Sequence, residues 1–175
     1  MNAAPAKMWV LAGEQFACIK ISGRANFSSS IDFKTLIQEL SQRGCGYFVL
    51  DLSECTLMDS TFLGVLAGFG LKAQASKGEP GKAVLELLNA NERVTELLES
   101  LGVLHLFRLT QGPLQVPAFA ESQALSTSCP TREDVRRACL EAHETLMQIN
   151  PQNASKFKEV AAFLTEDLKK SPPGA

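Results

Sequence analysis

The stretch that decides the fold reads Asp51-Leu52-Ser53-Glu54-Cys55-Thr56-Leu57-Met58-Asp59-Ser60-Thr61-Phe62-Leu63-Gly64. It continues the apolar run of residues 47–50, which is typical of a strand buried on both faces of a sheet. We expect a turn after Ser53 and then a helix from Ser60 to about Ser76. The stretch therefore links the carboxyl end of a buried strand to the start of a helix, where open α/β sheets concentrate ligands and chemistry.

The segments around this stretch alternate between strand and helix patterns. A break at 23–26 separates a hairpin from the first helix, and Gly102 stands where a left-handed residue closes a helix. The order predicts an α/β fold, a single domain with a mixed, mostly parallel sheet flanked by helices. The expected strands are 8–13, 16–22, 47–52, 83–88 and 103–109; the other expected helices run from one of Ser28, Ser29 and Ser30 to Gly44, and over 92–101.

The C-terminal third has a different character. After residue 110 the composition shifts to Gly, Pro, Ser and Gln, which indicates a connector. Thr131 and Asp134 then form a capping-box pattern, and two apolar helical stripes follow, separated by Asn150-Pro151. The sequence thus predicts a domain at 8–110, a connector at 111–130 with a short helix at about 119–125, a helical hairpin at 131–170 and a disordered tail at 171–175.

Composition excludes several classes of protein. The chain has 175 residues, 45% apolar and 21% charged, with a formal net charge of −2, so it is globular and nucleic acid is not an expected partner. Five cysteines without C-x-x-C spacing and two distant histidines argue against a disulfide framework, and we expect no metal and no cofactor. No signal-peptide h-region or membrane-length apolar stretch occurs, so we expect a cytoplasmic protein without membrane insertion.

Ser60 is positioned to carry a phosphate. Ser60 and Thr61 fall in the first turn of the predicted helix, among backbone N–H groups that lack helical partners. Those groups and the helix dipole favour a negative charge there, by about 0.3–1 kcal/mol at an exposed site. The Asp59 carboxylate repels a phosphate. These opposing effects suit a modification that is reversible.

The helix after Ser60 carries two further patterns. Phe62, Val65 and Phe69 recur at three- and four-residue spacing. If the leucines of the helix face the sheet, this stripe lies at the surface, beside a phosphate able to control its use as a protein interface. Small residues, among them Gly64, provide a side that can approach the sheet closely.

Simpler interpretations of these residues stay open. Ser60 or Asp59 can merely cap the helix, and the two phenylalanines can be core residues covered by the C-terminal hairpin. An enzyme with Ser60 as nucleophile needs a base and a group that orients the base. His105 is the only histidine of the predicted domain, and we expect it to be a half-buried strand residue. Since no Gly-x-Ser-x-Gly motif occurs either, we expect no enzymatic activity.

Over about residues 8–110 the chain resembles the STAS domain of anti-sigma-factor antagonists. In that family Asp-Leu-Ser or similar ends a strand, and Met-Asp-Ser-Ser/Thr-Gly-Leu-Gly begins a helix. Asp51–Ser53 and Met58–Gly64 stand in those places. The family's phosphorylated serine directly follows the aspartate, so the resemblance carries this role onto Ser60, with Thr61 as the second choice. Gly23-Arg24-Ala25-Asn26 resembles the family's Gly-Glu-Leu-Asp loop.

The resemblance implies a phosphorylation-controlled protein-binding switch. The unmodified protein binds a partner serine kinase, the anti-sigma factor, and so frees a sigma factor. Phosphorylation of Ser60 by that kinase ends the interaction, and a separate phosphatase restores it. Together with the apolar stripe, this gives a set of expected partner-binding residues, namely Asn26, Asp59, Thr61, Phe62, Val65 and Phe69.

Two departures from the family favour an alternative. Phe62 replaces the family's glycine, and the predicted hairpin at 131–170 has no counterpart in the minimal domain. Both features suit a non-phosphorylated STAS scaffold, such as the accessory subunit of a lipid-transport ATPase or of a signalling assembly.

Overall fold

The computed structural model describes residues 6–75, 84–115, 121–126 and 128–170. It contains one six-stranded sheet of order β5-β4-β3-β2-β1-β6, in which β1 is antiparallel to both its neighbours and the other pairs are parallel. The predicted α/β class with a mixed, mostly parallel sheet is therefore confirmed. In chain order the elements are β1 (Lys7–Ala12), β2 (Phe16–Ala25), α1 (Phe27–Gln42), β3 (Tyr47–Met58), α2 (Ser60–Ala75), β4 (Val84–Leu88), α3 (Glu92–Ser100), the 3₁₀ helix η1 (Leu104–Leu106), β5 (Arg108–Thr110), β6 (Glu121–Ala124), α4 (Arg132–Ile149), the 3₁₀ helix η2 (Pro151–Asn153) and α5 (Ala154–Lys170).

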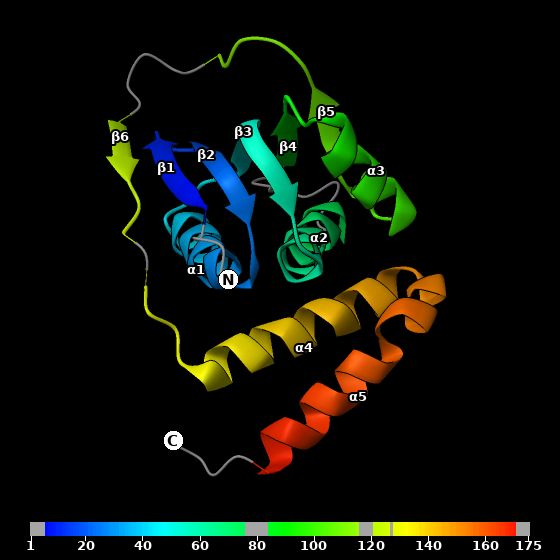
Figure 1. The fold of residues 1–175 in the computed structure, drawn as a ribbon. Coiled ribbons are helices and arrows are strands. Elements are labelled where there is room, and N and C mark those ends of the chain that lie inside the picture. The colour runs from blue at the N-terminus through cyan, green and yellow to red at the C-terminus, as the bar shows by residue number, and fades with distance from the viewer. Residues whose placement is uncertain (1–5, 76–83, 116–120, 127, 171–175) are drawn as a thin grey trace.

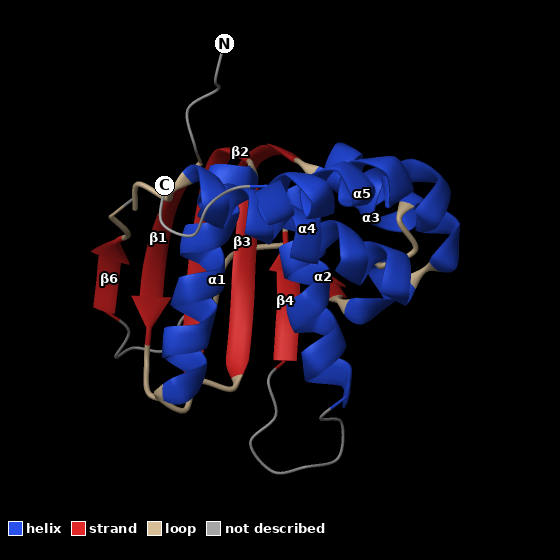
Figure 2. Cartoon of the chain, turned by 90° about the horizontal axis from the view of Figure 1, so that it is seen from below, coloured by secondary structure: helices blue, strands red, loops and turns tan. Residues whose placement is uncertain are grey.

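Three layers build the molecule. Helices α1 and α2 cover one face of the sheet, and the hairpin of α4 and α5 lies on their outer side (Figures 1 and 2). The predicted helical hairpin is thus confirmed, and α4 begins with the expected capping box of Thr131 and Asp134. Among the described helices, none combines the length and apolar character that crossing a bilayer requires.

The central strand β3 is longer than the sequence pattern predicts. Phe48 and Leu50 are buried on the helix side of the sheet, and Val49 is buried on the opposite side. The expected turn after Ser53 and the expected break at 23–26 are both wrong, because these two segments pair with each other. Register shifts between Lys20 and Ser22 and between Gly23 and Arg24 accommodate the extension.

Some local boundaries also differ. Helix α1 is capped by Asn26, in a capping box with Ser29, rather than by a serine of 28–30. The last expected strand is mostly wrong, since residues 104–106 form η1 and β5 starts only at Arg108. Gly102 has a φ of 69°, as expected for the left-handed residue after α3.

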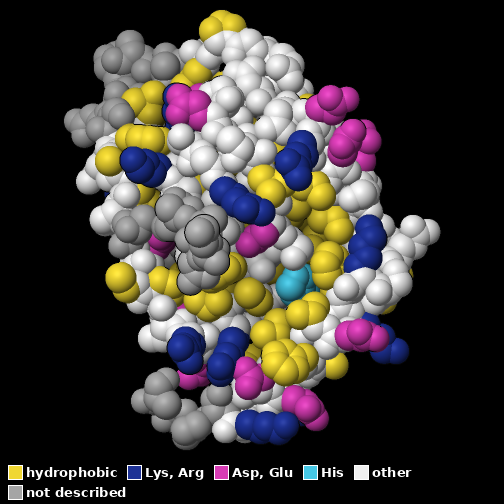
Figure 3. Space-filling model, viewed as in Figure 1, with side chains coloured by type: hydrophobic (Ala, Val, Ile, Leu, Met, Phe, Trp, Pro, Cys, Tyr) yellow, Lys and Arg dark blue, Asp and Glu magenta, His cyan; other side chains and the backbone are white. Residues whose placement is uncertain are grey.

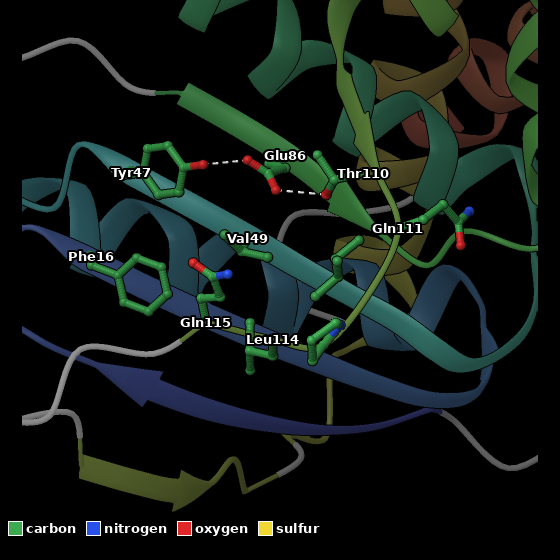
Figure 4. A pocket seen from close by; sticks show the side chains of 10 residues that line it. Phe16, Tyr47, Val49, Glu86, Thr110, Gln111, Leu114 and Gln115 are labelled. Carbon is green, nitrogen blue, oxygen red and sulfur yellow. Dashed lines mark hydrogen bonds between the residues drawn. The ribbon is translucent and has the colours of Figure 1, made fainter.

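The opposite face of the sheet is crossed by the chain that follows β5. Leu114 packs there on the cluster of Cys18, Val49 and Leu88. Beside it lies a cavity of about 560 Å³, where Tyr47 and Thr110 both donate hydrogen bonds to Glu86 (Figure 4).

The chain that crosses this face then adds β6 to the edge of β1, where a short helix at 119–125 is expected. That expectation is wrong for the described part of the segment, because residues 121–124 instead pair with the backbone groups at the edge of β1. Residues 119 and 120 and the tail at 171–175 lie outside the described residues.

Helices α2 and α4 are in unusually close contact. A Cβ atom on Gly64 would lie 2.5 Å from the backbone oxygen of Ala142 in α4. A Cβ atom on Gly68, one turn later, would meet Thr145 Cγ2 at an ordinary 3.7 Å. The small-residue side of α2 therefore faces α4, and the expectation that it faces the sheet is wrong for these two glycines.

Because of this contact, we expect two similar substitutions to have opposite effects on stability. We expect Gly64→Ala to destabilise the protein by about 1–3 kcal/mol, because the added methyl overpacks the contact with the α4 backbone. Gly68→Ala adds the same methyl without a clash, so we expect it to stabilise by up to about 1 kcal/mol through helix propensity. Urea denaturation of both variants measures the difference, and equal effects would contradict the close packing.

Candidate functional site

Asp59 ties the starts of two helices together. Its Oδ1 accepts a hydrogen bond from the Phe62 N–H at 2.8 Å, which makes it the N-cap of α2. Its Oδ2 accepts another from the Phe27 N–H of α1, also at 2.8 Å. The interpretation of Asp59 as a cap is confirmed, and both carboxylate oxygens are engaged. Asn26 lies beside it as the cap of α1, with its side chain accepting from the Ser29 N–H at 3.2 Å.

Ser60 and Thr61, the two hydroxyl residues of the Met58–Gly64 motif, both contact α4 but differ in exposure. Ser60 is half-buried, and its Oγ lies 2.9 Å from Nε2 of His143. Thr61 is only 4% exposed, and its Oγ1 donates to Cys139 Sγ at 3.3 Å. Ser60 is therefore the more accessible hydroxyl, although α4 holds it as well.

His143 is the residue that the sequence alone does not single out. It is buried, and its ring stacks on Phe157 of α5 with 4.8 Å between centroids. Burial lowers the pKa of His143, although the nearby Asp59 charge opposes the shift, so the ring is neutral at pH 7. One signal was present in the sequence: His143 lies four residues after Cys139 and three before Leu146, in register with the apolar stripe of the predicted helix.

The expected surface stripe on α2 is largely buried. Phe62 is 0% exposed, and its ring lies 5.0 Å from that of Phe33 in α1. Phe69 is half-buried and meets the same Phe33 ring edge-on at 6.0 Å. Val65 is partly buried against the core. The expectation of an exposed stripe is thus wrong for Phe62, because α1 supplies an aromatic partner that the local sequence of α2 does not reveal.

The hairpin in turn presents apolar surface of its own. Hydrophobic side chains gather among charged ones on the face that carries α4 and α5 (Figure 3). On α5, Phe163 is 65% exposed and Val160 is 37% exposed. Outward-facing apolar side chains on the outermost layer are available for contact with other molecules.

The Ser60–His143 pair is incomplete as a catalytic device. A serine nucleophile needs a base whose second ring nitrogen is oriented by another group. Nδ1 of His143 is buried without a hydrogen-bond partner in the described part of the chain. His105, the base weighed from the sequence, is an exposed residue of η1, so the expectation of a half-buried strand histidine is wrong. Nor do the described residues include a cluster of three or more groups able to hold a metal ion.

Comparison with models of protein families identifies one family. A family model described as "Mlab, STAS domain" matches residues 11–110. No curated protein sequence matches the chain. The anti-sigma factor antagonist SpoIIAA in its unphosphorylated form is 14% identical, with a TM-score of 0.48 over 62% of this chain and 90% of that one. An anti-sigma factor antagonist from Mycobacterium paratuberculosis is 16% identical, with a TM-score of 0.49 over 62% and 89% of the two chains.

The burial of His143 makes stability depend on pH. The unfolded chain takes up a proton at this residue near its ordinary pKa of 6.5, whereas the folded protein resists protonation. The folded state therefore binds fewer protons, and we expect its stability to fall as the pH drops below about 6.5. Melting temperatures at pH 7.5 and 5.5, compared with those of His143→Gln, measure this, and the wild type should lose more. Parallel losses in the two proteins would mean that His143 is not the titrating group.

Proposed function

This chain belongs to the STAS domain family, and on that premise we propose that it is a protein-binding switch of the anti-sigma-factor-antagonist kind, with Ser60 as its phosphate acceptor. The observation that carries the proposal is the position of Ser60. It opens α2 directly after the capping Asp59, and it is half-exposed while the neighbouring Thr61 is buried.

The proposed partner is a serine kinase that acts as an anti-sigma factor. Ser60 Oγ attacks the γ-phosphorus of ATP held by that kinase. The bond between Oγ and phosphorus forms, the bond between phosphorus and the bridging oxygen of ADP breaks, and the hydroxyl proton passes to a base of the kinase. A phosphatase later hydrolyses the ester. This chain supplies only the acceptor hydroxyl, so we propose no enzymatic activity of its own.

Charge is the proposed reason that modification ends binding. A phosphoserine carries about −1.5 to −2 charges at pH 7. Next to the Asp59 carboxylate, and without an arginine to meet it, burial of that charge in an interface costs several kcal/mol. The unmodified start of α2 lacks this charge, so its burial against the kinase carries no such penalty.

The proposed location is the cytoplasm. All five cysteines are free thiols, which is the usual state in a reducing compartment.

A second candidate function is a non-phosphorylated scaffold, such as an accessory subunit of a lipid-transport ATPase. The observation that favours it is the cover that α4 places over the motif, through His143 on Ser60 and Cys139 on Thr61. Such a cover suits a site that no kinase needs to enter.

The identity of the modified hydroxyl tests the proposed switch. We expect protein purified from its native cell to carry one phosphate, and peptide mapping to place it on Ser60. Ser60→Ala should abolish the phosphate, whereas Thr61→Val, the matched control, should retain it because Thr61 is buried. Protein that carries no phosphate in any growth condition, or carries it on another residue, would contradict the proposal.

The partner captured from the same cells separates the two candidate functions. We expect an ATPase of the histidine-kinase type to copurify with the wild type and to be lost from Ser60→Asp, which carries a charge where the interface needs none. A transporter ATPase that binds both proteins equally would support the scaffold instead.

A further inference from the structure

We infer that a phosphate on Ser60 and the docked α4–α5 hairpin exclude each other, so that modification of Ser60 releases the hairpin from α2. The inference rests on the proposed function, because it concerns what the modification of that serine does to the rest of the chain. It also gives the hairpin a role, that of an internal ligand covering the motif.

The contact between Ser60 and His143 leaves no space for a phosphate. The Ser60 Oγ and the ring nitrogen are 2.9 Å apart, a hydrogen-bond distance, so a phosphorus atom with three further oxygens does not fit between them. The imidazole is buried and held by its stacking on Phe157. A phosphate on the side of Ser60 that faces α4 therefore requires the ring to move away, and α4 with it.

The helix pair resists a small adjustment. One turn beyond Ser60, the backbone of Gly64 lies so close to Ala142 that not even a methyl group fits between the two helices. Close-packed contacts of this kind do not deform gradually, so α4 either stays docked or comes away. The steric demand of the phosphate is therefore transmitted to the whole hairpin.

Electrostatic repulsion also favours release of the hairpin. Asp59, the residue before Ser60, carries a negative charge that repels a phosphate on Ser60. No hydrogen bond or ion pair in the described residues joins Ser60 or His143 to a lysine or arginine. Of the other groups around the ring, Cys139 and Phe157 contribute no positive charge. Burial lowers the pKa of His143, so before modification the ring carries no positive charge at pH 7 that would attract a phosphate under the hairpin.

Release changes what the molecule presents to partners. The side of α4 that packs on α2, which includes Ala138, Ala142 and Leu146, becomes accessible together with Phe163, which is already exposed on α5. In the unmodified protein the same side of α4 competes with any partner that binds the start of α2. Linkage then requires that a partner which removes the hairpin also makes Ser60 easier to modify.

Two cysteines of the chain provide a direct readout of hairpin release. Cys139 is half-buried under Thr61 in the α2–α4 contact, whereas Cys129 is exposed ahead of α4. We would prepare the full-length chain with phosphoserine incorporated at position 60 during synthesis, and a matched control with phosphoserine at the exposed Ser41 near the far end of α1. Alkylation by iodoacetamide is then followed residue by residue by mass spectrometry.

We expect phosphoserine at 60 to accelerate alkylation of Cys139 relative to Cys129 by about 5- to 150-fold, the usual range for coupling between two sites. The control at 41 should match the unmodified protein. Faster hydrogen exchange in α4 and α5 alone should accompany the change. The buried Cys18, Cys45 and Cys55 should stay protected, since the domain remains folded.

Equal or slower alkylation of Cys139 would overturn the inference, because the phosphate would then fit beneath the hairpin or pair with a protonated His143. Simultaneous reaction of Cys18, Cys45 and Cys55 would also overturn it, because the modification would then unfold the domain rather than release the hairpin. No kinase takes part in this experiment. Its failure therefore leaves the proposed function standing, and that function is tested by the phosphate found in native cells.

Discussion

The packing of α4 against the start of α2 is the constraint on which the rest of the site depends. Gly64 allows the two backbones to meet at Ala142, and this contact brings His143 within hydrogen-bond distance of Ser60 and Cys139 within reach of Thr61. A STAS domain without this hairpin would present the motif directly to solvent. Here a third layer covers it, so access of a partner to the motif depends on whether the hairpin is docked.

The polar groups around the motif comprise two helix caps and one accessible hydroxyl. Asp59 and Asn26 cap the two helices, and Asp59 also accepts from the Phe27 N–H, which fixes the two helix starts relative to each other. Ser60 is the hydroxyl left half-exposed, and its partner is a buried neutral imidazole with one unsatisfied nitrogen. A buried polar group without a full set of partners costs free energy, so this contact is a weak point of an otherwise well-packed interface. Weak points of this kind are where a small chemical change can shift an equilibrium between two arrangements.

Local signals in the sequence were sufficient for much of the fold. The apolar run before Asp51, the left-handed Gly102 and the Thr131 capping box each obey rules that act within a few residues. What could not be predicted depends on contacts between distant segments. Phe62 is buried because Phe33 lies opposite it, and His143 meets a serine 83 residues away. Periodicity shows that a helix has an apolar side, but it does not show which partner covers that side.

The protonation state of His143 is the most direct test of the central contact. Nitrogen chemical shifts of its imidazole, followed by NMR from pH 8 to 5, report both the charge and the hydrogen bond at Nε2. The account predicts a neutral ring at pH 7 that titrates below the ordinary value of 6.5, with an Nε2 resonance that moves in Ser60→Ala. A ring that titrates at or above that value, with shifts indifferent to the loss of the Ser60 hydroxyl, would contradict the docked arrangement and the switch built on it.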